Sequence, residues 1–118
     1  MMRSLSKRLP WLLGLLCGWL LLAAPVWAVD TTATTPTASV LFETHCAGCH
    51  SGGGNIVRRR KTLKLRALQR NEVASVAAIA QLITDGKGAM SAYRDRLTVD
   101  DIDRLSQYVW QQAQNNWQ

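Results

Sequence analysis

Apolar residues recur at helical spacing in the second half of the chain, and these stripes predict its longest helices. One stripe spans residues 73–83, in a helix that Asn71 is expected to cap and Gly86 to end. The other belongs to a last helix that begins at Thr98, whose hydroxyl can cap the first turn. The apolar positions are Val73, Val76, Ala77, Ala80 and Ile83 in the first helix, and Ile102, Leu105, Tyr108, Val109 and Ala113 in the second.

Two shorter helices are predicted upstream of these stripes. Residues 38–46 have an apolar face that includes Val40, and residues 63–70 fit one further short helix. Residues 51–55 hold three consecutive glycines and predict a loop, because glycine costs about 1 kcal/mol relative to alanine inside a helix. No segment alternates apolar and polar residues with a period of two. The predicted fold class is therefore all-α, with four to five short helices.

The first 28 residues have the features of a secretory signal. Three basic residues precede an apolar run over residues 11–24, and a small-residue cleavage site ends at Ala28. This run of 14 residues is shorter than the roughly 20 that a spanning helix needs, so we favour cleavage over an uncleaved anchor. We expect residues 1–28 to be removed on export, residues 29–37 to form a threonine-rich flexible tether, and residues 38–118 to form one domain.

The exported part of the chain would contain two cysteines, and both belong to one motif. Cys46 and Cys49 are separated by two residues, and His50 follows at once. This spacing is the attachment motif for a c-type haem, in which each thiol adds across a haem vinyl group and the imidazole ligates the iron. Cys17 lies in the expected signal, so no other thiol would remain for a disulfide. We predict one covalent haem c.

Met90 is the candidate for the second axial ligand of the iron. The two N-terminal methionines would leave with the signal, and His45 lies too close to Cys46 to reach the opposite face of the haem. Met90 lies among small, flexible residues, 86–92, which can bring its thioether onto the iron from the far side. A thioether stabilises ferrous iron, and filling both axial positions leaves none for oxygen or peroxide. The ligand pair thus favours electron transfer over catalysis.

The segment from Phe42 through Trp117 resembles cytochrome c6, a small electron carrier of cyanobacteria and algae. Besides the haem motif, the resemblance rests on residues 85–90, on Arg96 before the last helix and on the segments 52–53, 61–64 and 108–109. It implies a class I cytochrome c fold, in which the first and last helices cross with Phe42 near Tyr108.

The resemblance also implies the roles of individual residues. Cys46 and Cys49 would hold the haem, and His50 and Met90 would ligate its iron. The protein would be an electron carrier in the thylakoid lumen or the periplasm, and not an enzyme. It would accept electrons from the cytochrome b6f complex and pass them by transient docking to photosystem I or a cytochrome oxidase.

The distribution of basic residues indicates a candidate docking surface. Without the signal, eleven basic and eight acidic residues remain, so the net charge falls from +6 to +3 and indicates no nucleic-acid binding. Arg58, Arg59 and Arg60 form a run of cations with Lys61, which fits a solvated loop, a docking patch or a partner for a haem propionate. Arg96 matches a family arginine near the docking surface.

Several residues depart from the family pattern and keep a second function open. Leu82 occupies a position, eight residues before Met90, where the photosynthetic carrier usually has glutamine. A polar group beside the haem helps to set its potential, so an apolar one is expected to change it. The alternative is a lower-potential cytochrome c6-like carrier or redox sensor with a different partner. The other departures are Ala38, Ser91, Arg94, Asp95 and the arginine triplet.

Two interpretations without haem fit the motif less well. A thiol–disulfide oxidoreductase would place Cys46 and Cys49 in a strand–helix setting, and no strand is predicted. A zinc site would need His45 and His50 as further ligands, and four ligands in so short a segment could hardly surround one tetrahedral ion.

Overall fold

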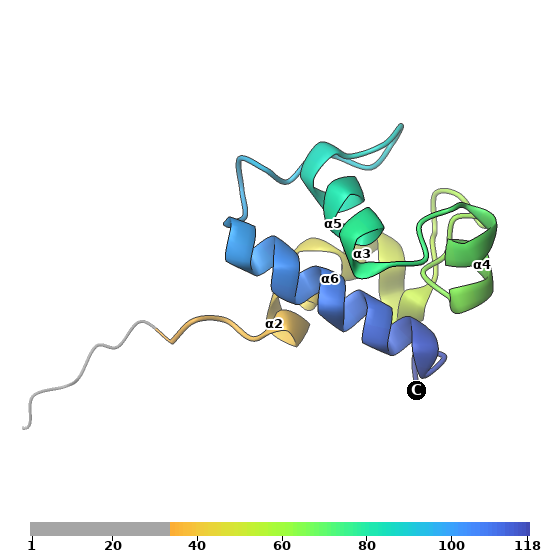
Figure 1. Ribbon diagram of the computed structural model, residues 1–118, viewed down its shortest axis with the longest axis horizontal. Coiled ribbons are helices and arrows are strands. Elements are labelled where there is room, and N and C mark those ends of the chain that lie inside the picture. Colours follow the sequence, from red (N-terminus) through yellow and green to blue (C-terminus); the bar gives the residue numbers. More distant parts are fainter. Residues whose placement is uncertain (1–33) are drawn as a thin grey trace, which may run out of the picture. The chain divides into compact units, whose positions relative to one another are not determined.

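The computed structural model describes residues 34–118, and the expected signal and most of the expected tether lie outside these residues (Figure 1). The described part contains helices and no strand, which confirms the all-α prediction. None of its helices is long and apolar enough to cross a membrane. The helices are α2 (Ala38–His45), α3 (Ala47–His50), α4 (Leu65–Arg70), α5 (Val76–Asp85) and α6 (Val99–Gln114), with a 3-10 turn, η1 (Ser51–Gly53).

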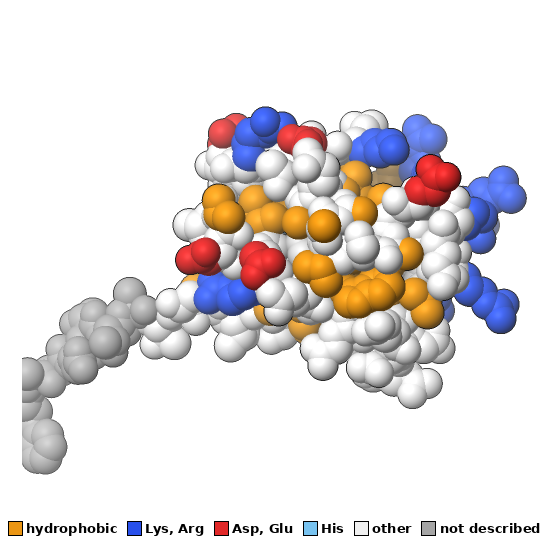
Figure 2. Space-filling view, viewed as in Figure 1, with side chains coloured by type: hydrophobic (Ala, Val, Ile, Leu, Met, Phe, Trp, Pro, Cys, Tyr) orange, Lys and Arg blue, Asp and Glu red, His pale blue; other side chains and the backbone are white. Residues whose placement is uncertain are grey.

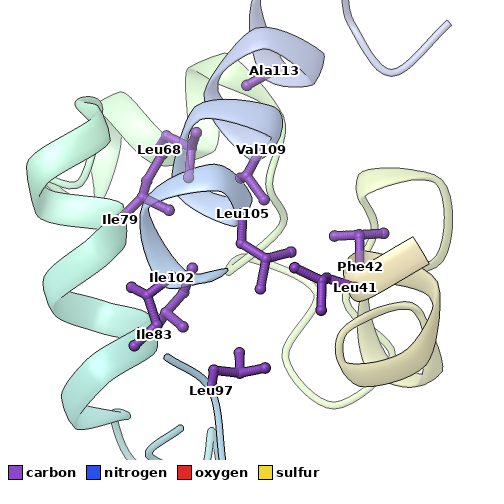
Figure 3. Close-up of a cluster of buried hydrophobic side chains, with 10 residues drawn as sticks. All are labelled: Leu41, Phe42, Leu68, Ile79, Ile83, Leu97, Ile102, Leu105, Val109 and Ala113. Carbon is purple, nitrogen blue, oxygen red and sulfur yellow. The ribbon is translucent and has the colours of Figure 1, made fainter. Parts of the chain in front are cut away.

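The longest helix, α6, begins where the sequence predicts. Thr98 Oγ1 accepts a hydrogen bond from the backbone N–H of Asp101, and the Asp101 carboxylate accepts one from the Thr98 N–H. This reciprocal pair satisfies two donors that a helix N-terminus otherwise leaves free. The apolar stripe of α6 faces α2 and α5, so it forms the centre of the core (Figure 3). The core residues are Leu41, Phe42, Leu68, Ile79, Ile83, Leu97, Ile102, Leu105, Val109 and Ala113.

Helices α2 and α6 meet through aromatic side chains. Phe42 is 2% exposed, and its ring centroid lies 5.5 Å from that of Tyr108 and 5.1 Å from that of Trp117. The predicted proximity of Phe42 to Tyr108 is therefore confirmed. The indole Nε1–H of Trp117 donates to the carbonyl of Leu63 at 3.0 Å. This bond joins the end of the chain to the segment before α4.

Three details of the predicted helices are wrong. Helix α5 begins at Val76, so Val73 precedes it, and its buried positions are Ile79 and Ile83, whereas Ala77 of the predicted stripe is exposed. Asn71 ends α4 and does not cap α5, whose first turn is capped instead by Ser75 through a hydrogen bond from Ala78 N–H. Glu72 has a φ of 60°, so the chain leaves helical conformation directly after Asn71. On α2, Val40 is 52% exposed, so the apolar face is narrower than predicted and consists of Leu41 and Phe42.

Candidate haem site

One cavity of about 360 Å³ brings the four predicted haem residues together. Cys46, Cys49 and His50 line it from the helical segment after α2, and Met90 lines it from the loop after α5. Two thiols, an imidazole and a thioether in one cavity are the donor set that a covalently attached, doubly ligated haem requires. Much of the remaining wall is apolar, which suits a large flat macrocycle. These apolar side chains are Phe42, Val57, Leu63, Leu68, Val73, Ile79, Leu82, Ile83, Ala89 and Val109.

The imidazole of His50 is oriented by a backbone contact. Its Nδ1 atom lies 2.9 Å from the carbonyl oxygen of Gly54, a distance that fits an N–H donating to that carbonyl. With the proton on Nδ1, the lone pair on Nε2 is free for a metal. Gly52 and Gly53 allow the return of the chain that presents this carbonyl, because both have positive φ. From the sequence, the three consecutive glycines predict only a loop; the structure shows that this loop turns back to contact His50.

The two cysteines lie in different surroundings. Cys46 is partly buried, its N–H donates to the Phe42 carbonyl at 2.8 Å, and burial raises the pKa of its thiol to about 11. Cys49 is exposed. A redox-active dithiol needs a lowered thiol pKa, so the environment of Cys46 opposes the thiol–disulfide interpretation. Within residues 34–118, no three His, Cys, Asp or Glu side chains are grouped so that they could hold a metal ion.

The loop that carries Met90 is closed by its own backbone. The Lys87 N–H donates to the Met90 carbonyl at 3.0 Å, and the Met90 N–H donates to the Lys87 carbonyl at 3.1 Å. Gly86 ends α5 with a φ of 68°, and a Cβ atom there would lie closer than 3.0 Å to the Met90 carbonyl. The position of Met90 thus depends on glycine at residue 86, which the sequence analysis identified only as a helix stop.

The four predicted docking arginines lie in different places. Arg58 lines the cavity, whereas Arg59, Arg60 and Arg96 do not. Arg59 and Arg60 are exposed on the loop before α4. The Arg96 guanidinium lies over the ring of Tyr93, 4.5 Å from the ring centroid.

Asn55, Asn71 and Tyr93 are among the cavity residues that the sequence did not predict as site residues. Asn55 and Asn71 give the cavity a polar edge next to Arg58 and Lys61, and Asn71 accepts a hydrogen bond from Lys61 Nζ at 2.6 Å. Tyr93 lines the cavity and donates its hydroxyl hydrogen to the carbonyl of His45. None of these residues belongs to a local motif, so spacing alone could not identify them.

Comparisons with known proteins find a family model and curated relatives that match most of the described residues. The family model described as cytochrome C oxidase, cbb3-type, subunit III, matches residues 33–109. Cytochrome c6 of Aphanizomenon flos-aquae is 46% identical over 72% of this chain and 98% of its own length. A cytochrome c6-like protein of Nostoc sp. is 44% identical over 65% of this chain and 69% of its own length.

Solved structures of cytochromes also align with this chain. The crystal structure of cytochrome c6C from Synechococcus sp. PCC 7002 aligns with a TM-score of 0.65 and 58% identity, covering 66% of this chain and 95% of that one. Cytochrome c6B from Synechococcus sp. WH8102 aligns with a TM-score of 0.66 and 46% identity, covering 69% of this chain and 92% of that one.

Proposed function

Because the chain belongs to the cytochrome c6 family, whose members carry one covalently bound haem c, we propose that it is a single-electron carrier and not an enzyme. Cys46 and Cys49 attach the haem, and His50 and Met90 ligate its iron. The observation that carries this proposal is that all four residues line one largely apolar cavity. A haem bound there supplies an Fe(III)/Fe(II) couple, and a thioether ligand raises the reduction potential of this couple.

The chain's own residues favour outer-sphere electron transfer. Gly54 holds the His50 ring with Nε2 free, and the Lys87–Met90 bonds fix the loop of the second ligand. If His50 and Met90 both ligated the iron, no ligand position would be left for a substrate. Because the ligands are held by the fold, a change of oxidation state would require little movement, which keeps electron transfer fast.

A docking surface for the partner adjoins the cavity. We define the basic ridge as the seven cations of residues 58–70, all of which are exposed, and this segment contains no acidic residue. None of the seven forms an ion pair with another described residue. Figure 2 shows lysine and arginine side chains projecting from the end of the molecule where α4 lies. The ridge consists of Arg58, Arg59, Arg60, Lys61, Lys64, Arg66 and Arg70.

The basic ridge begins at the cavity, because two of its residues, Arg58 and Lys61, also line the cavity wall. Beside it, Ile56 and Val57 are 75% and 55% exposed. Cations around a few exposed apolar side chains suit a transient complex, in which charge steers the approach and a small contact area permits fast release. The partner is therefore an acidic surface on an electron-transfer complex: the cytochrome b6f complex as donor, and photosystem I or a cytochrome oxidase as acceptor. Export to the thylakoid lumen or periplasm, with residues 1–28 removed, belongs to the same proposal.

A second candidate function is a lower-potential carrier or redox sensor with a different partner. Leu82 lines the cavity, where it presents an apolar side chain to the haem. The identities of 58% and 46% to cytochromes c6C and c6B also favour a variant of the photosynthetic carrier.

A redox titration of the haem-loaded protein, with its visible spectrum, tests the proposal and separates the two candidates. We expect haem to stay attached after denaturation, and ferric protein to show the near-infrared charge-transfer band of a thioether ligand. A potential between those of a quinol-oxidising complex and photosystem I supports the photosynthetic carrier. A clearly lower potential with the thioether band intact supports the second candidate. Release of the haem on denaturation would refute attachment through Cys46 and Cys49.

A further inference from the structure

Tyr93 connects two walls of the cavity that are far apart in the sequence. Its hydroxyl donates a hydrogen bond to the carbonyl of His45 at 2.8 Å. His45 directly precedes Cys46, and Tyr93 follows Met90 by three residues. Among hydrogen bonds between described residues, this is the only one that joins residues 38–54 to residues 86–97. We propose that Tyr93 is a positioning residue that keeps the Met90 thioether at the iron by tying its loop to the haem-attachment segment.

The backbone of Tyr93 is itself fixed at both of its polar groups. Its N–H donates to the carbonyl of Ile83 in α5 at 3.0 Å. Its carbonyl accepts from the N–H groups of Arg96 and Leu97 at 2.9 and 3.0 Å. The backbone of Tyr93 is therefore held against α5, and its hydroxyl connects this fixed position to His45 on the opposite wall.

The ring of Tyr93 is held by two further contacts. The His45 ring meets it nearly edge-on, with centroids 6.0 Å apart and planes at 75°. The Arg96 guanidinium covers the ring at 4.5 Å. These neighbours restrict rotation of the side chain, so the hydroxyl is already oriented toward the His45 carbonyl and little entropy is lost in making the bond.

Other contacts of the Met90 loop cannot replace this connection. The Lys87–Met90 hydrogen bonds close the loop on itself and reach neither α2 nor α3. The ion pair between Asp85 and Arg94 also connects only neighbouring parts of the same segment, and its side chains are 38% and 53% exposed. Solvent screens such a pair, which makes it a weak restraint. Arg94 therefore offers a matched control in the same loop.

The test is the rate at which imidazole replaces Met90 on the iron of the haem-loaded ferric protein. At saturating imidazole, this rate is limited by dissociation of the thioether. Tyr93→Phe removes only the hydroxyl, and we expect it to raise the limiting rate about fivefold, the effect of one typical hydrogen bond. Arg94→Gln should leave the rate within about twofold of the wild-type value, because the pair that it removes is exposed.

A purely structural role would have a different signature. If Tyr93 positions Met90, the exchange occurs by local opening, and its rate responds only weakly to low concentrations of urea. A limiting rate that is unchanged in Tyr93→Phe, or that rises only in step with global unfolding, would overturn the positioning role.

The inference rests on the proposed function, since Met90 must be the iron ligand. Met90→Ala tests that premise separately, because it should abolish the near-infrared thioether band. Persistence of the band would refute Met90 ligation and, with it, any role of Tyr93 in positioning this side chain. Loss of the band together with an unchanged exchange rate in Tyr93→Phe would refute the role of Tyr93 alone.

Discussion

Gly53 lies against the indole ring of Trp117, and a Cβ atom at residue 53 would come closer than 3.0 Å to three ring atoms. The glycine belongs to the turn that presents the Gly54 carbonyl to His50, and the tryptophan packs on Phe42 in the core. This close approach links the turn that contacts His50 to the crossing of α2 and α6.

Substitution of Gly53 is therefore predicted to destabilise the fold more than substitution of its neighbour. Gly53→Ala combines a φ of 72° with the clash on Trp117, and we expect a cost of about 2–4 kcal/mol. Gly52 has a φ of 55°, but a Cβ atom added there would meet no other atom within 4 Å, so Gly52→Ala should cost only about 1 kcal/mol. Urea unfolding of both haem-loaded variants measures the difference, and equal costs would contradict the clash.

The sequence predicted those parts of the site whose signals are local. Cys46, Cys49 and His50 form a continuous motif, and Met90 remained by elimination, so no tertiary information was needed to predict them as haem residues. The hydrogen bond from Tyr93 to His45 spans 48 residues and has no local signal. It depends on how α5 packs on α6 and where the Met90 loop then returns, which only the folded chain determines.

The error at the start of α5 has a similar physical cause. Asn71 and Ser75 are both good N-cap residues, and the sequence offers no reason to prefer one of them. The choice follows from the positive φ of Glu72 and from contacts of the Asn71 amide, which donates to the carbonyls of Arg60 and Ala67. These contacts involve the loop before α4, so helical periodicity cannot reveal them.

Leu82→Gln is predicted to raise the midpoint potential of the haem. Leu82 lines the cavity, and an amide in its place can direct N–H groups toward the macrocycle and stabilise the additional electron of the reduced state. A rise on the order of 60 mV would correspond to a tenfold change in the one-electron equilibrium. Leu82→Met is the matched control, because it keeps an apolar side chain of similar size and should change the potential little. A lower potential in Leu82→Gln would contradict the argument.

Removal of charge from the basic ridge is predicted to slow electron transfer to a partner at low ionic strength. Replacement of Arg58, Arg59 and Arg60 by glutamine should lower the second-order rate constant with photosystem I particles by about tenfold and flatten its salt dependence. The three side chains are exposed and form no ion pair among the described residues, so the fold should be unaffected. Flash photolysis across a range of salt concentrations measures both effects.

A pair of single variants separates the position of a charge from the net charge. Arg59→Gln and Arg94→Gln each remove one cation, but only Arg59 belongs to the ridge. We expect Arg59→Gln to slow the reaction and Arg94→Gln to have little effect. Equal effects would mean that total charge, and not the ridge, determines the association rate.

The capping box of α6 is predicted to make stability depend on pH through Asp101. Hydrogen bonds from Thr98, and then from Arg104, hold the pKa of the Asp101 carboxyl below its ordinary value. A carboxyl whose pKa is lower in the folded state stabilises the fold above its unfolded-state pKa, about 3.9, and this contribution is lost as the pH falls through the folded value. Asp101→Asn should therefore lower the midpoint of urea unfolding at neutral pH, and the variant and the wild type should converge under acid conditions.

Asp100→Asn is the control, because it removes the same charge from the first turn of α6 without breaking the capping box. A constant difference between Asp101→Asn and the wild type at all pH values would show that the cap contributes through shape alone and not through its charge.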